Sequence, residues 1–172
     1  IVKIEYLLIY FIKTYLKMKA AKVIYKNREI FEKDPIDGVS IGYDEDNIFK
    51  WNITILGPKD SPYEGGIFNA IMTFPQNYPL SPPTFQFTNN IFHPNIYDDG
   101  KVCISILHPP GEDRFNEQET ADMRWRPVHT ASSIILSIIS LLSAPNDESP
   151  ANVDAAKIWR EDEKQFQEIV NK

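Results

Sequence analysis

The sequence predicts a single α+β domain: an N-terminal helix, a four-stranded antiparallel meander, a long irregular segment and two or more C-terminal helices. Two observations support this fold class. Four short apolar segments are joined by turn-rich connectors, and apolar residues recur at helical spacing before and after them. A chain of 172 residues, 42% of them hydrophobic and 24% charged, is long enough to bury one core.

The first helix is expected from Met18 to Asp34, because the residue before Pro35 avoids the α region of backbone space. The preceding residues 1–17, "IVKIEYLLIYFIKTYLK", are apolar in patches and contain no small-residue cleavage site of a signal peptide. Charged side chains keep the apolar runs well below the roughly 20 residues of a membrane span: Lys3, Glu5 and Lys13. We expect residues 1–17 to be a buried or interfacial helix, or sequence upstream of a start at Met18, with the domain covering residues 18–172.

Four strands are expected between Val39 and Thr88, in "VSIGY", "FKWNITIL", "IFNAIMTF" and "TFQFT". The connectors "GPKDSPYEGG" and "PQNYPLSPP" are short and rich in turn-forming residues, which favours antiparallel neighbours. Alternate positions of the second strand carry apolar side chains, as a strand with one buried face requires: Phe49, Trp51, Ile53 and Ile55.

Regular periodicity stops from about Asn89 to Pro127, and irregular segments of this length in a compact domain are usually functional or disordered. A helix is expected in "HTASSIILSIISLLS", capped by Thr130 or Ser132 and apolar nearly all round, which predicts a central position. Asn152 can cap a last helix. That helix would have one apolar stripe: Ala155, Trp159, Phe166 and Val170.

Charge and cysteine content narrow the functional classes. Eighteen Lys and Arg against 24 Asp and Glu give a net charge of −6, which disfavours nucleic acid or anionic membrane as the main partner and favours a basic protein surface. The single cysteine excludes an intrachain disulfide and the paired spacing of zinc or thioredoxin-like sites. A reducing compartment is therefore expected.

The single cysteine, Cys103, lies in "HPNIYDDGKVCISILHPPGED". A lone cysteine is commonly a buried small hydrophobe, but this one sits in a Pro- and Gly-rich segment with an amide donor and base groups nearby in sequence, the parts needed for acyl transfer. A cysteine hydrolase would need an oriented base among His93, His108 and His129, and for His93, before a proline, a packing role is equally expected. A zinc site built from these residues lacks regular ligand spacing.

The segment "HPNIYDDGKVCISIL", with Asn95 eight residues before Cys103, resembles the active-site signature of ubiquitin-conjugating enzymes. The order of "GPKDSPYEGG", "YPLSPP", "RWRPVHT" and the flanking helices is also similar to that family, from Met18 to the C-terminus. The acidic run "HPPGEDRFNEQETADMR" resembles the extra loop of the G-type, yeast Ubc7-like subfamily, although such a run is otherwise typical of a solvated loop.

The resemblance implies a two-step acyl transfer with no cofactor. Cys103 would accept ubiquitin from the activating enzyme as a thioester and pass it to a lysine, guided by a RING-type ligase. Asn95 would support the oxyanion, or hold its turn through backbone bonds. Many family members have an acidic residue before the last helix where this chain has Ser149. His108, Glu112 and Asp113 are expected to take over that role, because the loop can fold back over the cysteine, and His93 is a further supporting residue.

The resemblance also implies partners. The N-terminal helix would meet the activating enzyme, and Leu80, Pro127 and Val128 would meet the ligase, with ordinary loop packing as the alternative. The subfamily implies a cytoplasmic protein, recruited to the cytosolic face of the endoplasmic reticulum for protein degradation. The rival interpretation is a non-catalytic ubiquitin-pathway binding module of the same fold, against which the intact Cys103 and Asn95 argue.

Overall fold

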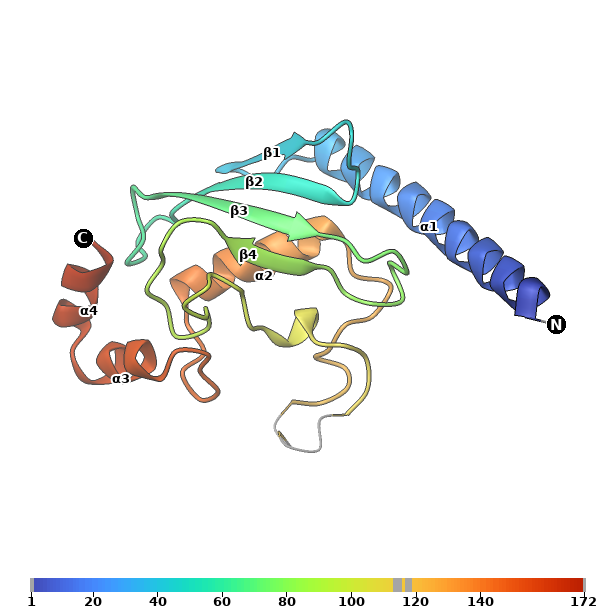
Figure 1. Cartoon of the computed structure of the whole chain (residues 1–172). Helices are drawn as coiled ribbons and strands as arrows, with labels where there is room; N and C mark the ends of the chain where they lie inside the picture. Colours follow the sequence, from blue (N-terminus) through green and yellow to red (C-terminus); the bar gives the residue numbers. More distant parts are fainter. Residues whose placement is uncertain (1, 113–115, 117–118, 172) are drawn as a thin grey trace.

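The structure is a computed structural model that describes residues 2–112, 116 and 119–171 (Figure 1). The elements follow the predicted order, which confirms the α+β fold class. They are α1 (Val2–Lys33), β1 (Val39–Tyr43), β2 (Lys50–Leu56), β3 (Ile67–Thr73), β4 (Thr84–Phe87), the 3₁₀ helix η1 (Ser105–Leu107), α2 (Ala131–Ser143), α3 (Val153–Glu161) and α4 (Glu163–Val170).

The four strands form one antiparallel sheet in the order β1-β2-β3-β4, as the short connectors predicted. The alternation in β2 is confirmed, because Trp51, Ile53 and Ile55 are buried and the residues between them are not. Figure 1 shows α2 lying along one face of the sheet. Four large apolar side chains of α2 are fully buried, which makes it the central helix that the sequence predicted, although Leu136 on its other face is exposed: Ile134, Ile135, Ile138 and Leu142.

Helix α2 begins at a capping box. The Thr130 hydroxyl accepts a hydrogen bond from the Ser133 N–H, while the Ser133 hydroxyl accepts one from the Thr130 N–H. The Asn27 side chain of α1 accepts a hydrogen bond from the Ala131 N–H at 2.7 Å. Thr130, rather than Ser132, is therefore the cap, and α1 is attached directly to the start of the central helix.

Helix α1 begins at Val2, far before the expected start at Met18, because no glycine or proline interrupts the sequence up to Lys33. Figure 1 shows its N-terminal half projecting away from the other elements. The expectation of a buried helix is wrong for the described side chains from Glu5 to Tyr15, which are exposed. Within the described residues, no helix has the length and apolar character needed to cross a membrane.

The expected last helix is two helices. Asp162 has the non-helical backbone angles φ −151° and ψ 84°, and its carboxylate accepts a hydrogen bond from the Gln165 N–H at 2.9 Å, so that α4 starts with its own cap. The Asn152 cap of α3 is confirmed by its bond from the Ala155 N–H. The predicted apolar stripe spans the break, because the rings of Trp159 and Phe166 lie 5.0 Å apart.

Candidate active site

A tight turn positions Cys103 after the sheet. The Cys103 N–H donates to the carbonyl of Asn95 at 2.9 Å, and the Phe87 N–H of β4 donates to the carbonyl of Gly100 at 2.8 Å. Gly100 has a φ of +85°, and a Cβ at this position would lie 2.1 Å from the Phe87 carbonyl oxygen. Only glycine combines this conformation with this close approach, so the turn fixes the cysteine relative to the sheet edge.

The buried Asn95 side chain connects the cysteine turn to the segment after α2. Its Nδ2 donates to the carbonyl of Asn146 at 2.6 Å, and its Oδ1 accepts from the Asn146 N–H at 2.9 Å. An asparagine amide has two N–H donors, and this pair uses one of them. These bonds connect the loop to the segment after α2, and among the described residues no bond uses the second donor.

His93 lies beneath this turn and is completely buried. Its Nδ1 accepts a hydrogen bond from the Asn95 N–H at 2.8 Å, so the ring proton is on Nε2, which donates to the Leu141 carbonyl at 3.0 Å. Burial lowers the pKa of His93 to about 4. The ring is therefore neutral near pH 7 and supports the site by holding its backbone.

The residue that faces the thiol is His108, directly after η1. Its Nε2 lies 3.5 Å from Cys103 Sγ, and the Tyr97 hydroxyl lies 3.6 Å from the same sulfur. The hydrogen bond with His108, followed by that of Tyr97, holds the pKa of the half-buried Cys103 below its ordinary value. The bond with Cys103 and the contacts with Glu119 raise the pKa of His108. Both shifts favour a thiolate and imidazolium pair.

His108 is in turn bonded to Glu119. The carboxylate Oε1 lies 2.7 Å from His108 Nδ1, and Oε2 lies 3.7 Å from Nε of Arg124. Glu119 is only 7% exposed although it belongs to the acidic segment. The backbone N–H of Trp125 donates to the His108 carbonyl at 3.1 Å. This bond holds the two ends of the acidic segment together beside the histidine.

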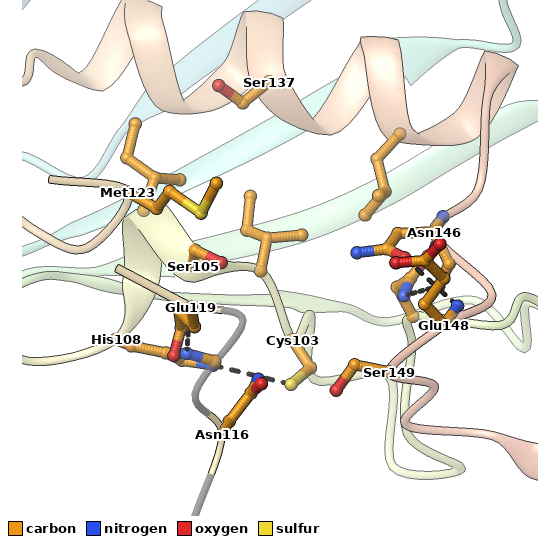
Figure 2. Close-up of a pocket in the computed structure, with 14 residues that line it drawn as sticks. Cys103, Ser105, His108, Asn116, Glu119, Met123, Ser137, Asn146, Glu148 and Ser149 are labelled. Atoms are coloured by element: carbon orange, nitrogen blue, oxygen red, sulfur yellow. Dashed lines mark hydrogen bonds and ion pairs between the residues drawn. The ribbon is translucent and has the colours of Figure 1, made fainter. Parts of the chain in front are cut away.

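Cys103 and His108 line two neighbouring cavities of about 390 and 370 Å³. Figure 2 shows the first, in which Cys103 lies between His108 with Glu119 on one side and Ser149 on the other, with Glu148 farther along that side. The second cavity extends past Tyr97. The thiol is thus open to approach from two cavities.

The predicted supporting residues have different outcomes. His108 faces the thiol. His129, which was considered only as the base of a cysteine hydrolase, packs against Trp125, with ring centroids 5.7 Å apart. Glu112 is exposed and is not among the described residues that line the two cavities. Asp113 lies outside the described residues.

Among the residues that the sequence did not point to, three bear on the chemistry of the thiol: Tyr97, Glu119 and Glu148. Tyr97 was within reach, since it lies two residues after Asn95 in the motif. Glu148 was also within reach, since it precedes Ser149 in the connector between α2 and α3. Glu119 has no local signal, because it comes to the cysteine through a long irregular segment.

Leu80, Pro127 and Val128 are exposed, and the first and last of these are 60% and 71% exposed. The Trp125 indole N–H donates to the Pro79 carbonyl at 2.8 Å, which joins the two loops that carry them. We call these three residues the Leu80–Val128 surface. It presents apolar side chains to solvent rather than packing them inside a loop.

Comparisons with known proteins agree with this geometry. A sequence model of the family described as ubiquitin-conjugating enzyme matches residues 23–172. The chain is 59% identical over 155 residues to Ubiquitin-conjugating enzyme E2 7 of Arabidopsis thaliana, covering 90% of this chain and 93% of that protein. It is 52% identical over 137 residues to Ubiquitin-conjugating enzyme E2 G2 of Homo sapiens, covering 79% and 82%.

A third relative, Ubiquitin-conjugating enzyme E2 15 of Schizosaccharomyces pombe, is 48% identical over 152 residues, with 88% of this chain and 90% of that protein covered. The family match extends from the last third of α1 through the sheet and the cysteine turn to the C-terminal helices. The chain therefore belongs to the ubiquitin-conjugating enzymes, which receive ubiquitin from an activating enzyme and transfer it onward with a ligase.

Proposed function

We propose that Cys103 is the residue that carries ubiquitin as a thioester. The observation that supports this role is the contact of its sulfur with His108 and Tyr97 at the mouth of two cavities. The lowered pKa of Cys103 increases the thiolate fraction near neutral pH, and the thiolate is the nucleophilic form. In loading, this sulfur attacks the thioester carbonyl on the activating enzyme, whose own cysteine leaves as the thiolate.

Asn95 is proposed to act twice in the second half-reaction. Its bonds to Asn146 hold the two walls of the site together, and its second N–H is available to the oxyanion that forms when an amine attacks the thioester. A positioned amide donor of this kind typically contributes a factor of about 10² to 10³ in rate. His93 is proposed to support Asn95 by fixing its backbone N–H.

His108 is proposed to accept the proton of the incoming lysine amine. Once Cys103 is acylated, His108 Nε2 no longer faces a thiolate, and the neutral imidazole becomes a base beside the reacting carbon. Glu148, on another wall of the same cavity, is proposed to attract the lysine ammonium next to Ser149, the position where many family members have an acid. The two groups would divide orientation and proton removal between them.

The test is a loading assay. The chain is incubated with activating enzyme, ATP and ubiquitin, and a thiol-reducible adduct is expected on wild type and not on Cys103→Ala. Glu161→Gln, at the exposed end of α3, is a control that should load normally. An adduct on Cys103→Ala, or none on wild type, would exclude Cys103 as the carrier; absence on wild type would favour the rival interpretation, a non-catalytic binding module.

Further proposals concern partners and location. The Leu80–Val128 surface, beside the sheet connectors, is proposed to bind a RING-type ligase, since exposed apolar patches of this kind mark protein contacts. We propose that the catalytic domain covers residues 18–172. The part of α1 that lies within it, residues 18–33, is proposed to bind the activating enzyme. The G-type resemblance supports a cytoplasmic protein recruited to the cytosolic face of the endoplasmic reticulum, where it serves protein degradation.

A further inference from the structure

Glu119 forms the third position of a line that starts at the thiol. Cys103 Sγ lies 3.5 Å from His108 Nε2, and His108 Nδ1 lies 2.7 Å from Glu119 Oε1. The Glu119 side chain is 4% exposed, whereas the side chain of Asp122, three residues later, is 93% exposed. A carboxylate that is buried while the described acidic residues Glu112 and Asp122 of the same segment are exposed needs a specific partner there.

We propose that Glu119 is a positioning residue: it holds His108 with its proton on Nδ1 and its Nε2 directed at the sulfur of Cys103. This inference rests on the proposed function of Cys103 and His108. It also assigns a task to the acidic segment, whose far end returns Glu119 to the site. The role belongs to Glu119 rather than to the overall negative charge of the segment.

The tautomer follows from hydrogen-bond chemistry. An ionised carboxylate has no proton to donate, so the 2.7 Å contact requires a proton on His108 Nδ1 and leaves Nε2 free to accept one. His93 has the opposite arrangement, because its Nδ1 accepts from a backbone N–H and its Nε2 donates to a carbonyl. The same site therefore contains two histidines in opposite tautomers, each set by its partner.

The protons taken up and released by Cys103, His108 and the lysine balance over one catalytic cycle. In the free enzyme the Cys103 proton rests on His108 Nε2, and the thiolate attacks the thioester of the activating enzyme. The imidazolium then faces a neutral thioester and releases this proton to solvent. In discharge, the lysine ammonium first loses one proton to solvent. As the amine forms its C–N bond, a second proton moves to His108 Nε2, and the C–S bond breaks to return the Cys103 thiolate.

Charged and titratable groups approach His108 from several sides. Cys103 faces Nε2, with Tyr97 bonded to the same sulfur, and Glu119 faces Nδ1. Arg124 lies behind the Glu119 carboxylate at 3.7 Å, and Glu148 lines the same cavity. Of these groups, Glu119 alone is hydrogen-bonded to Nδ1 among the bonds recorded for the described residues, so it sets the orientation of the ring.

The first experiment measures single-turnover discharge of the thioester to free lysine. Glu119→Gln should slow discharge by about 10- to 100-fold, the size of effect seen when a carboxylate that orients a metal-bound histidine is removed. Asp122→Asn removes the same charge from the same segment and should stay within about twofold of wild type. His108→Asn should be slow, and adding Glu119→Gln to it should change the rate by less than about twofold, because Glu119 acts only through His108.

The second measurement reads the tautomer directly by ¹H–¹⁵N correlation on the ring nitrogens, in Cys103→Ser to keep the imidazole neutral. The chain has only three histidines, which simplifies assignment. His108 should be protonated on Nδ1, and His93 on Nε2. In Glu119→Ala the His108 preference should be lost while the His93 pattern persists, which shows that the fold is intact.

Three results would overturn the role of Glu119 while leaving the proposed function standing: wild-type discharge by Glu119→Gln when His108→Asn is slow, additive effects in the double variant, or His108 protonated on Nε2. Unchanged discharge by His108→Asn would instead reject the proposed base itself, and the role of Glu119 with it. The two failures are therefore distinguishable in one set of assays.

Discussion

The side-chain amide of Asn95 makes two hydrogen bonds with the backbone of Asn146, accepting from its N–H at 2.9 Å and donating to its carbonyl at 2.6 Å. This pair joins the turn that positions Cys103 to the segment that carries Glu148 and Ser149. The two walls of the first cavity are therefore connected by one side chain, and that side chain is also the proposed oxyanion donor.

Replacing Asn95 by alanine should affect both stability and rate. Loss of two hydrogen bonds should lower the free energy of unfolding by about 2 kcal/mol, measured by urea denaturation. Discharge to lysine should fall by about 10² to 10³-fold if the second N–H also serves the oxyanion. Asn47→Ala, in an exposed turn, should leave discharge at the wild-type rate. A stability loss with unchanged discharge would restrict Asn95 to its structural role.

Tyr97→Phe should make the thiol less reactive. The hydroxyl 3.6 Å from Cys103 Sγ helps to lower the pKa of the thiol, so its loss should raise that pKa. Alkylation of Cys103 by iodoacetamide at pH 7 should slow by roughly three- to tenfold, followed by mass spectrometry. Tyr25→Phe, on exposed α1, provides the matched control. Equal alkylation rates in all three proteins would mean that the hydroxyl does not stabilise the thiolate.

Glu148→Gln should weaken capture of the lysine ammonium. An exposed carboxylate contributes about 0.5 to 1 kcal/mol to such an ion pair, which corresponds to a roughly two- to fivefold higher KM for free lysine. The difference should shrink as salt is raised from low ionic strength, because salt screens exposed charges. Glu161→Gln, at the exposed end of α3, should not change KM. A salt-independent defect would point to a role other than charge attraction.

Stability should fall at acidic pH through His93. Its pKa is about 4 in the folded chain against an ordinary 6.5, so the unfolded chain binds the extra proton first as the pH falls. The contribution is complete above pH 6.5 and is lost progressively toward pH 4. Between pH 7.5 and 5 the loss is about 2 kcal/mol. Urea denaturation of wild type should show this loss, and His93→Gln should lack it. Parallel pH profiles would contradict the assignment.

Leu80→Glu should abolish stimulation by a RING-type ligase without preventing thioester formation. The side chain is exposed, so the substitution costs little folding energy, but it places a charge in the centre of the Leu80–Val128 surface. Val153→Glu introduces the same change at the equally exposed start of α3, where ligase stimulation should be retained. Full stimulation of Leu80→Glu would remove this surface as the ligase site, and parallel loss of loading would indicate misfolding.

Local patterns in the sequence were sufficient for most of the fold. The alternation in β2, the caps at Thr130 and Asn152 and the apolar run of α2 all act over a few residues, so they can be interpreted without knowing what packs against them. The expected start of the first helix at Met18 was wrong because the helical sequence continues back to Val2. The other two errors have a local and a non-local cause. Asp162 offered an unrecognised cap that divides the last helix, and the exposure of the first half of α1 depends on what lies beside it.

By itself, the sequence determined the domain class, the family resemblance and the pairing of Asn95 with Cys103, because that motif is contiguous and its turn is built from its own residues. Only the tertiary structure decided that His108 faces the thiol while His93 is buried beneath it, and that Glu119 rather than Glu112 reaches the site. These contacts depend on how an irregular segment of the chain closes on itself, and periodicity carries no information about such closure.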